Sequence, residues 1–224
     1  LDGFASPEEC RAFAAATRRF SMRPVVGDTE VGQPAFAAQR IDHLGMTQAE
    51  YKRRGRDAYL EAAQHATAEV RQVFDLSFDP VARLVEWLRP CVAGPVGIAH
   101  EADGRPYFCG IIRGSNEGLA LHADFAPYQA RKLAIDRVEA QLAWNFYPEV
   151  PAEGGDTTLH NAPWTWTPTR ADEVADNYPL PRSLVEGART FRYHPKVGEA
   201  WLFNTRNPHE VSAIRSRECD RLAV

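Results

Sequence analysis

Three side chains in the C-terminal half of the chain carry donor atoms suited to a divalent metal. His122 and Asp124 lie in the run Leu119-Ala-Leu-His-Ala-Asp-Phe125, and His209 lies in Asn204-Thr-Arg-Asn-Pro-His-Glu-Val211. Two imidazoles and one carboxylate can occupy one triangular face of an octahedral ion and leave the opposite face open for reaction. We therefore expect His122, Asp124 and His209 to form a catalytic iron(II) centre.

The spacing of the first two ligands fits a β-strand. Residues two apart on a strand project from the same face, so His122 and Asp124 would point one way and Leu121 and Ala123 the other. A His-x-Asp sequence arises by chance in a chain with 7 histidines and 30 acidic residues, so it indicates a metal site only together with His209. The competing histidines lack a carboxylate two residues away and are expected to be structural: His100, His160 and His194.

An arginine follows the last histidine ligand at a spacing that suits a cosubstrate site. Arg221 begins the strand-like segment Arg221-Leu-Ala-Val224, twelve residues after His209. A guanidinium is always charged and presents a planar fork of donors that pairs with a carboxylate in bidentate fashion. Arg215 and Arg217 compete for this role, but they lie in a polar stretch that reads as a turn. We therefore expect Arg221 to bind a dicarboxylate cosubstrate beside the metal.

Five segments of the chain resemble the Fe(II)/2-oxoglutarate-dependent dioxygenases, in particular the prolyl-hydroxylase-like branch and its small-molecule amino-acid hydroxylase relatives. The segments occur in the order found in that family: Leu121–Asp124, Glu153–Thr157, Val197–Phe203, Arg206–Val211 and Arg221–Val224. The resemblance covers roughly residues 107–224, and the run Asn-Pro-His-Glu-Val is its most specific part.

The resemblance implies a double-stranded β-helix of jelly-roll, cupin-like type, with Fe(II), 2-oxoglutarate and O2 as cofactors. It implies that His122, Asp124 and His209 bind the iron and that Arg221 binds the far carboxylate of 2-oxoglutarate. Halogenases of the family have Gly or Ala in place of the carboxylate ligand, so Asp124 favours hydroxylation. Further residues are expected around the pocket: Tyr107 and Asn145 at the cosubstrate, and Arg113, Trp164, Trp166 and Arg206 at the substrate.

Three amphipathic helices are expected in residues 1–94. The first begins after the N-cap Ser6, the second runs from a capping box at Thr47 to Phe74, and the third runs from Asp79 to Pro90. Apolar residues at helical spacing on each of them predict that they pack on the outside of a sheet. We assign them a supporting role and no chemistry.

Short β-rich segments separated by Gly, Pro or Asn follow from residue 95 onward. They lie at residues 107–113, 119–125, 141–147, 157–160, 190–194, 200–203 and 221–224. Helices followed by a run of short strands indicate an α+β fold, here a single domain over residues 1–224. Residues 131–137 fit a loop or a short helix over the barrel mouth, and the Trp-rich stretch 161–186 is a candidate substrate lid.

Composition limits the class of partner. The net charge of −4, without a clustered basic stripe, argues against nucleic acid. No apolar run approaches the roughly 20 residues of a membrane span, and the first residues lack the features of a signal peptide. The four cysteines form no Cys-x-x-Cys pair, which favours a reducing cytoplasm over a zinc knuckle or a redox motif.

The function expected from these features is hydroxylation of an unactivated C–H bond in a small molecule, such as a free amino acid or a biosynthetic intermediate. A hydroxylase of protein or peptide side chains, of prolyl-hydroxylase type, is the first alternative. A non-oxidative, cupin-like metal-binding protein is the second, and Arg221 argues against it because such a protein needs no partner for a dicarboxylate. The sequence leaves open the substrate, the oligomeric state, and desaturation or cyclisation in place of hydroxylation.

Overall fold

The computed structural model describes residues 1–24, 41–47, 55–115, 117–130, 132–165, 179–215 and 221–224. Several sequence predictions fall outside these ranges. They concern Trp166, Arg217 and half of the candidate lid.

The first and third of the three expected helices form where their N-cap residues predict. Helix α1, Pro7–Thr17, has a complete capping box, because Ser6 Oγ accepts from the Glu9 amide at 3.2 Å and the Glu9 carboxylate accepts from the Ser6 amide at 2.8 Å. Helix α4, Pro80–Leu88, begins after Asp79, whose carboxylate accepts from the Ala82 amide at 2.9 Å. A short 3-10 turn, η3, Arg89–Cys91, follows it.

The second helix begins later than expected. Helix α3, Arg56–Asp75, follows Gly55, which has φ 86° and ψ 175°. That backbone conformation is not helical, so a continuous helix from Thr47 to Phe74 is wrong. The local capping signal at Thr47 competes with a glycine that stops helical geometry, and residues 48–54 lie outside the described ranges.

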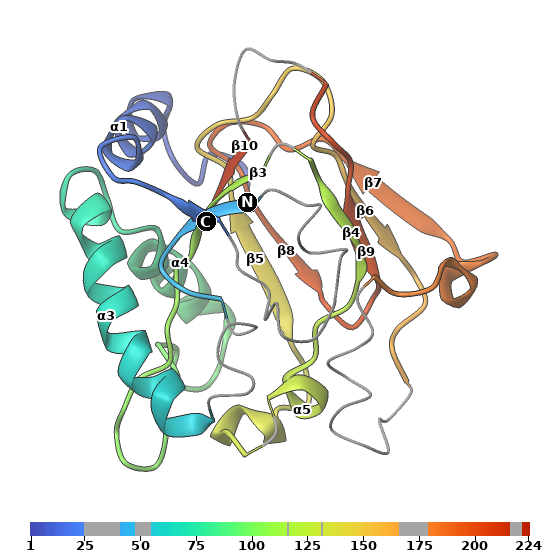
Figure 1. Ribbon diagram of the computed structural model, residues 1–224, viewed down its shortest axis with the longest axis horizontal. Coiled ribbons are helices and arrows are strands. Elements are labelled where there is room, and N and C mark those ends of the chain that lie inside the picture. Colours follow the sequence, from blue (N-terminus) through green and yellow to red (C-terminus); the bar gives the residue numbers. More distant parts are fainter. Residues whose placement is uncertain (25–40, 48–54, 116, 131, 166–178, 216–220) are drawn as a thin grey trace.

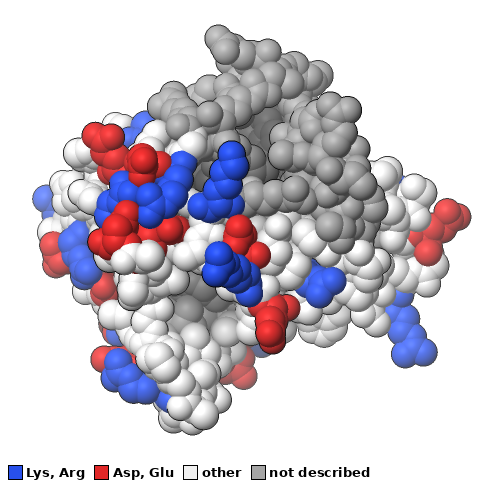
Figure 2. All heavy atoms as spheres, turned by 90° about the horizontal axis from the view of Figure 1, so that it is seen from below, with Lys and Arg blue, Asp and Glu red and all other residues white. Residues whose placement is uncertain are grey.

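Ion pairs hold the first turn of α3 against the hairpin at residues 101–106. Arg56 Nε donates to Glu101 at 3.1 Å and Arg56 Nη2 donates to Asp103 at 2.8 Å. Arg105 Nη2 reaches back to Asp57 at 2.7 Å. Figure 2 shows basic and acidic side chains interspersed on the described part of the face seen from below.

The described residues contain ten short strands, which form two layers of antiparallel sheet. The first layer contains β1 (Arg23–Pro24), β2 (Ile41–Leu44), β3 (Ile112–Ser115) and β10 (Arg221–Ala223), in that order. It continues into the pair β5 (Leu142–Phe146) and β8 (Ala200–Asn204), because Phe146 and Val224 exchange two backbone hydrogen bonds of 3.0 Å. The second layer has the order β4 (Leu119–His122), β9 (His209–Val211), β6 (Thr157–His160) and β7 (Thr190–Tyr193). This arrangement is the expected double-stranded β-helix.

Alternation along the strands of the first layer separates a helix-facing side from an inner side. Leu44, Ile112 and Leu222 join the core formed with α1, α3 and α4, which lie on one side of the sheets in Figure 1. Ala223 instead packs with Tyr147 and Tyr193, and Tyr193 belongs to β7 of the second layer. The space between the two layers is therefore lined by the odd-numbered positions of β3 and β10.

Two predictions about strands need correction. β1 and β2 lie in the part expected to be helical, because a two-residue strand and a four-residue strand with Asp42 and His43 at its centre give little apolar pattern. The strand expected at 107–113 begins only at Ile112, since Gly110 has φ 88° and interrupts extended geometry. The loop or short helix expected at residues 131–137 agrees with η4, Ala134–Arg137, a 3-10 turn that follows the short helix α5, Ala126–Gln129.

Among the described helices, none is long and apolar enough to span a bilayer.

Candidate metal and cosubstrate site

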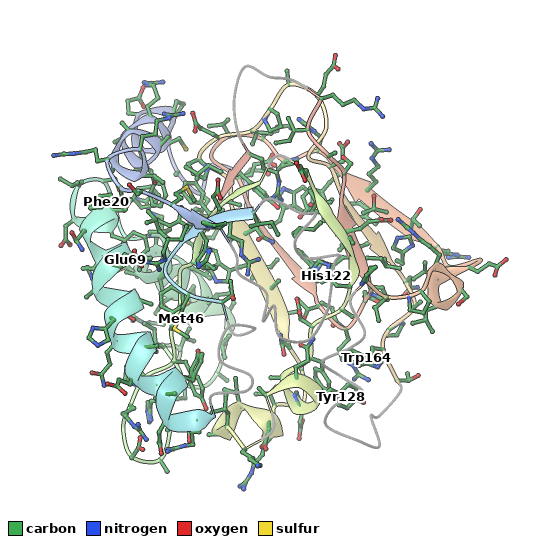
Figure 3. All side chains as sticks on the ribbon, in the orientation of Figure 1. Phe20, Met46, Glu69, His122, Tyr128 and Trp164 are labelled. Atoms are coloured by element: carbon green, nitrogen blue, oxygen red, sulfur yellow. The ribbon has the colours of Figure 1, made fainter. Side chains whose placement is uncertain are left out.

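Strand pairing brings the three expected metal ligands together. His122, at the end of β4, lies directly opposite His209, at the start of β9, and their ring centroids are 4.1 Å apart. Asp124 Oδ2 lies 4.0 Å from His122 Nε2 and 3.8 Å from His209 Nε2. One donor atom from each residue thus falls within 4.8 Å of the others. Figure 3 shows His122 on β4, on the side of the molecule away from Phe20, Met46 and Glu69.

The ligand-bearing strand ends earlier than expected, but its alternation continues. β4 stops at His122, and the next contact is a hydrogen bond of 2.9 Å from the Asp124 amide to the Thr205 carbonyl. Leu121 and Ala123 are buried, whereas His122 and Asp124 are only partly buried. The two ligands therefore leave the same side of an extended chain even though only the first belongs to the paired strand.

Backbone carbonyls set the orientation of both imidazoles. His122 Nδ1 lies 2.7 Å from the Ala120 carbonyl, and His209 Nδ1 lies 3.0 Å from the Asn207 carbonyl. A carbonyl can only accept, so each Nδ1 carries the proton and each Nε2 presents its lone pair toward Asp124. This donor set, two imidazole nitrogens and a carboxylate, suits a divalent iron ion with open coordination positions.

Burial keeps one of the imidazoles uncharged. His209 is only 5% exposed, and burial, with the nearby His122 adding to the effect, lowers the pKa of His209 to about 4 despite the opposing charge of Asp124. The positive charge of Arg113 lowers the pKa of His209 further, so Arg113 lies close enough to act on this ring. At neutral pH His209 is therefore unprotonated at Nε2, as a metal ligand must be.

A second polar cluster surrounds Arg221 on β10. Arg221 is 5% exposed, its Nη2 donates to the Tyr147 hydroxyl at 3.3 Å, and its guanidinium carbon lies 5.0 Å from the Tyr147 ring centroid. The hydroxyls of Tyr147 and Tyr193 are 3.1 Å apart, and Trp201 stacks on Tyr193 with centroids 4.0 Å apart. Within the described ranges, Arg221 Nε has no hydrogen-bond partner and no carboxylate forms an ion pair with this guanidinium.

Register relates the two clusters. His209 lies opposite Leu159, and two residues further along the same face Val211 lies opposite Thr157, which in turn lies opposite Tyr193. Tyr193 of the second cluster thus lies on the same face as His209, two residues further along the strand direction, a rise of roughly 7 Å, and two strands away across the sheet.

The two glycines before β6 make room for this cluster. A Cβ on Gly155 would lie 3.1 Å from Arg221 Cδ, and a Cβ on Gly154 would lie 2.1 Å from the Ala213 carbonyl oxygen. The φ angles of both residues are also positive, 81° at Gly154 and 73° at Gly155. Their place in the sequence motif therefore follows from close packing beside Arg221.

The residues expected at the substrate lie in different surroundings. Arg206 donates to the Trp164 carbonyl at 2.7 Å and lies 4.7 Å from the Phe125 ring centroid, next to Asp124 in the sequence. Trp164 packs edge-on against Tyr128 at 5.0 Å, and Figure 3 shows both near the lower end of β4. Trp166 lies outside the described residues.

The other two expected cosubstrate residues differ in their position relative to the Arg221 cluster. Tyr107 is buried with its hydroxyl donating to the Glu101 carboxylate, which also accepts from the Ala134 amide at 2.8 Å. Asn145 lies on β5, directly opposite Trp201 of β8, which stacks on Tyr193, so its position borders the cluster. Sequence reasoning missed Tyr147 and Tyr193, for which the only available signal was a tyrosine at the end of a predicted strand.

The competing residues have other partners or positions. Arg215 is exposed, and Arg217 lies outside the described residues. The three competing histidines each contact a protein group: His160 contacts Glu210 at 3.1 Å, His194 contacts Asp156 at 3.1 Å, and His100 contacts the Glu101 carbonyl at 3.1 Å.

Two characterised proteins are related in sequence, although no family model matches the chain. Leucinostatins biosynthesis cluster protein S of Purpureocillium lilacinum is 30% identical over 182 residues, which are 80% of this chain and 74% of that protein. The L-gamma-glutamyl-L-propargylglycine hydroxylase of Streptantibioticus cattleyicolor is 34% identical over 110 residues, 48% of this chain and 40% of the hydroxylase.

Solved structures share the fold. An N-substituted L-amino acid dioxygenase of Burkholderia ambifaria superposes with a TM-score of 0.55 at 16% identity, over 96% of this chain and 85% of the dioxygenase. The alpha-ketoglutarate-dependent epimerase SnoN from nogalamycin biosynthesis superposes with a TM-score of 0.50 at 15% identity, over 99% of this chain and 73% of the epimerase. The likeness in fold extends through the helical half, where the sequence carries no motif. The chain belongs to the Fe(II)/2-oxoglutarate-dependent dioxygenase superfamily.

Proposed function

We propose that this enzyme hydroxylates an unactivated C–H bond of a small molecule of amino-acid type. In this proposal His122, Asp124 and His209 hold Fe(II), and Arg221 holds the distal carboxylate of 2-oxoglutarate. The observation that carries it is the buried Arg221 guanidinium, which lacks a carboxylate partner in the described chain and lies near the metal ligands.

A buried charge without a counter-ion is unfavourable, so the site favours an anion from outside the chain. The fork of Arg221 suits a carboxylate, which it can bind in bidentate fashion. Tyr147 and Tyr193 stand beside it with hydroxyls in mutual contact, and either hydroxyl can donate to the same anion. Tyr193, whose hydroxyl contacts that of Tyr147 beside Arg221, lies on the same face as His209, which supports a single ligand that reaches both the arginine and the metal.

When bound, Fe(II) and 2-oxoglutarate would activate O2, the oxidant for C–H hydroxylation, with succinate and CO2 as coproducts. The chain's own residues supply geometry. His122 and His209 present Nε2 in fixed orientation, and Asp124 completes the ligand set on one side. Arg206 binds the Trp164 carbonyl and packs on Phe125, the residue that follows Asp124 in the sequence.

The related proteins support a small substrate. One is named as a hydroxylase of L-gamma-glutamyl-L-propargylglycine, and a fold neighbour is named as a dioxygenase of N-substituted L-amino acids. Both names describe a molecule with an amino-acid carboxylate. No observation on this chain favours a protein side chain as the substrate.

The test begins with anaerobic titration of the protein with Fe(II) and then with 2-oxoglutarate. O2 is then admitted with a panel of free L-amino acids, N-acyl L-amino acids and gamma-glutamyl dipeptides, while succinate and a product heavier by one oxygen atom are measured. Succinate release that depends on O2, on a panel member and on His209 supports the proposal. Failure of the wild-type protein to bind 2-oxoglutarate in the presence of Fe(II) contradicts it.

A further inference from the structure

A buried carboxylate lies next to the aromatic side chains of the Arg221 cluster. Glu199, the residue before β8, is only 9% exposed. Its Oε2 accepts from the indole nitrogen of Trp201 at 2.9 Å and from the Lys196 amide at 3.1 Å. Residues two apart in an extended chain project to the same side, which is why Glu199 can reach the Trp201 side chain. The carboxylate therefore fixes the position of this indole.

The indole of Trp201 is held at its polar edge and on one face. Its single polar group, Nε1, donates to Glu199, so the ring cannot turn without breaking that bond. The face of the indole stacks on the Tyr193 ring, with centroids 4.0 Å apart and an interplanar angle of 11°. Stacked aromatic pairs contribute stability beyond the area that they bury. Trp201 thus fixes the plane of the Tyr193 ring.

Tyr193 connects this stack to the cosubstrate arginine. Its hydroxyl lies 3.1 Å from the Tyr147 hydroxyl, which accepts from Arg221 Nη2 at 3.3 Å. Burial raises the pKa of Tyr193, so its hydroxyl keeps its proton at neutral pH. Two protonated hydroxyls beside a guanidinium can donate to one carboxylate only while both rings keep their places.

We propose that Glu199 and Trp201 are positioning residues for the cosubstrate. Glu199 orients the Trp201 indole, and the indole holds Tyr193 where its hydroxyl serves the anion on Arg221. Both residues act through Tyr193 and not by contact with 2-oxoglutarate. The proposal rests on the proposed function, because it concerns the affinity of that same site for 2-oxoglutarate.

The test measures 2-oxoglutarate affinity by anaerobic calorimetry on the Fe(II)-loaded wild type, E199A, E199Q, W201F and the double variant of E199A and W201F. We expect E199A and W201F each to weaken binding about 10-fold, roughly the loss of one hydrogen bond to a charged group. E199Q keeps an acceptor oxygen for the indole and should bind within about threefold of the wild type. The double variant should bind about as well as the weaker single variant, because both changes break the same linkage.

Two controls separate a positioning role from a general loss of packing. W144F is the matched variant, since Trp144 lies on the adjacent strand β5 and packs against the core on the helix side, and it should bind 2-oxoglutarate as the wild type does. Fe(II) affinity, measured without 2-oxoglutarate, should be unchanged in every variant. Thermal unfolding checks that each variant is folded, and W201F carries the test if E199A does not fold.

Four results would overturn the proposal while leaving the proposed function intact. They are wild-type affinity for 2-oxoglutarate in W201F, an affinity of E199Q as low as that of E199A, a loss in W144F equal to that in W201F, and a loss in the double variant that is the product of the two single losses. Failure of the wild type to bind 2-oxoglutarate would instead refute the proposed function itself.

Discussion

Replacing Arg221 by methionine should move stability and cosubstrate affinity in opposite directions. The guanidinium is 5% exposed, and its described partners are the hydroxyl and ring of Tyr147, with no carboxylate among them. Replacing buried charges by apolar groups of similar volume is often neutral or stabilises a protein by about 1–4 kcal/mol. We therefore expect the cosubstrate-free R221M protein to be at least as stable as the wild type.

The affinity for 2-oxoglutarate should fall at the same time. Removing one partner of a buried charge pair costs about 2–5 kcal/mol, which corresponds to a loss of roughly 30-fold or more. Saturating 2-oxoglutarate at about 100 times its dissociation constant should stabilise the wild type by about 2.7 kcal/mol and the variant by much less. Urea denaturation of the Fe(II) protein, with and without 2-oxoglutarate under anaerobic conditions, measures both quantities.

Two controls make the result specific. Arg215 is exposed, so R215M should leave both quantities near wild type. Y147F removes a hydroxyl that accepts from Arg221 but leaves the guanidinium charge in place, so it should lower the affinity for 2-oxoglutarate less than R221M does. Our reasoning is refuted if R221M destabilises the cosubstrate-free protein by several kcal/mol while it binds 2-oxoglutarate normally, because Arg221 would then be a structural residue.

Three further predictions follow from the site and its supports. H209A should lose Fe(II) binding and succinate formation while its unfolding temperature stays near wild type, and normal turnover would remove His209 from the ligand set. E101A, which leaves the buried Tyr107 hydroxyl without its acceptor, should lower the free energy of unfolding by about 1–3 kcal/mol without changing 2-oxoglutarate affinity. A tenfold loss of that affinity would instead put Tyr107 at the cosubstrate. Finally, hydrogen bonds from Arg83 lower the pKa of Glu9 to about 2 from 4.5, so this pair stabilises the fold above pH 4.5 and the contribution disappears as the pH falls toward 2. E9Q should flatten that part of the stability profile by less than about 1 kcal/mol, because the pair is partly exposed, and an unchanged acid profile would contradict the assignment.

The grouping of His122, Asp124 and His209 could be predicted from the sequence because it depends mainly on local spacing. His122 and Asp124 sit two residues apart, and alternation in an extended chain aims both to one side whether or not the second belongs to a paired strand. His209 follows a turn, and pairing of β4 with β9 then brings it opposite His122. Local spacing and one strand pair are enough to define this centre.

The tyrosines beside Arg221 depend on contacts that no local pattern encodes. Tyr147 and Tyr193 are far apart in the chain, and their hydroxyls meet only because β5, β7 and β10 lie around the same inner space. The strand at Ile41–Leu44 was not predicted for a related reason, since its stability comes from pairing with β3 at both its polar and its apolar residues. The helix expected from Thr47 is the reverse case, because a local capping signal is present there but the helix begins only after Gly55, whose backbone conformation is not helical.

The most direct test of the central claim is a crystal structure of the protein with Mn(II), as a redox-inert substitute for iron, and 2-oxoglutarate under anaerobic conditions. Our account predicts the metal on His122 Nε2, Asp124 and His209 Nε2, with the distal carboxylate of 2-oxoglutarate on the Arg221 guanidinium next to Tyr147. A metal bound elsewhere, or a distal carboxylate held by Arg113 or Arg215 with Arg221 left unpaired, would contradict it.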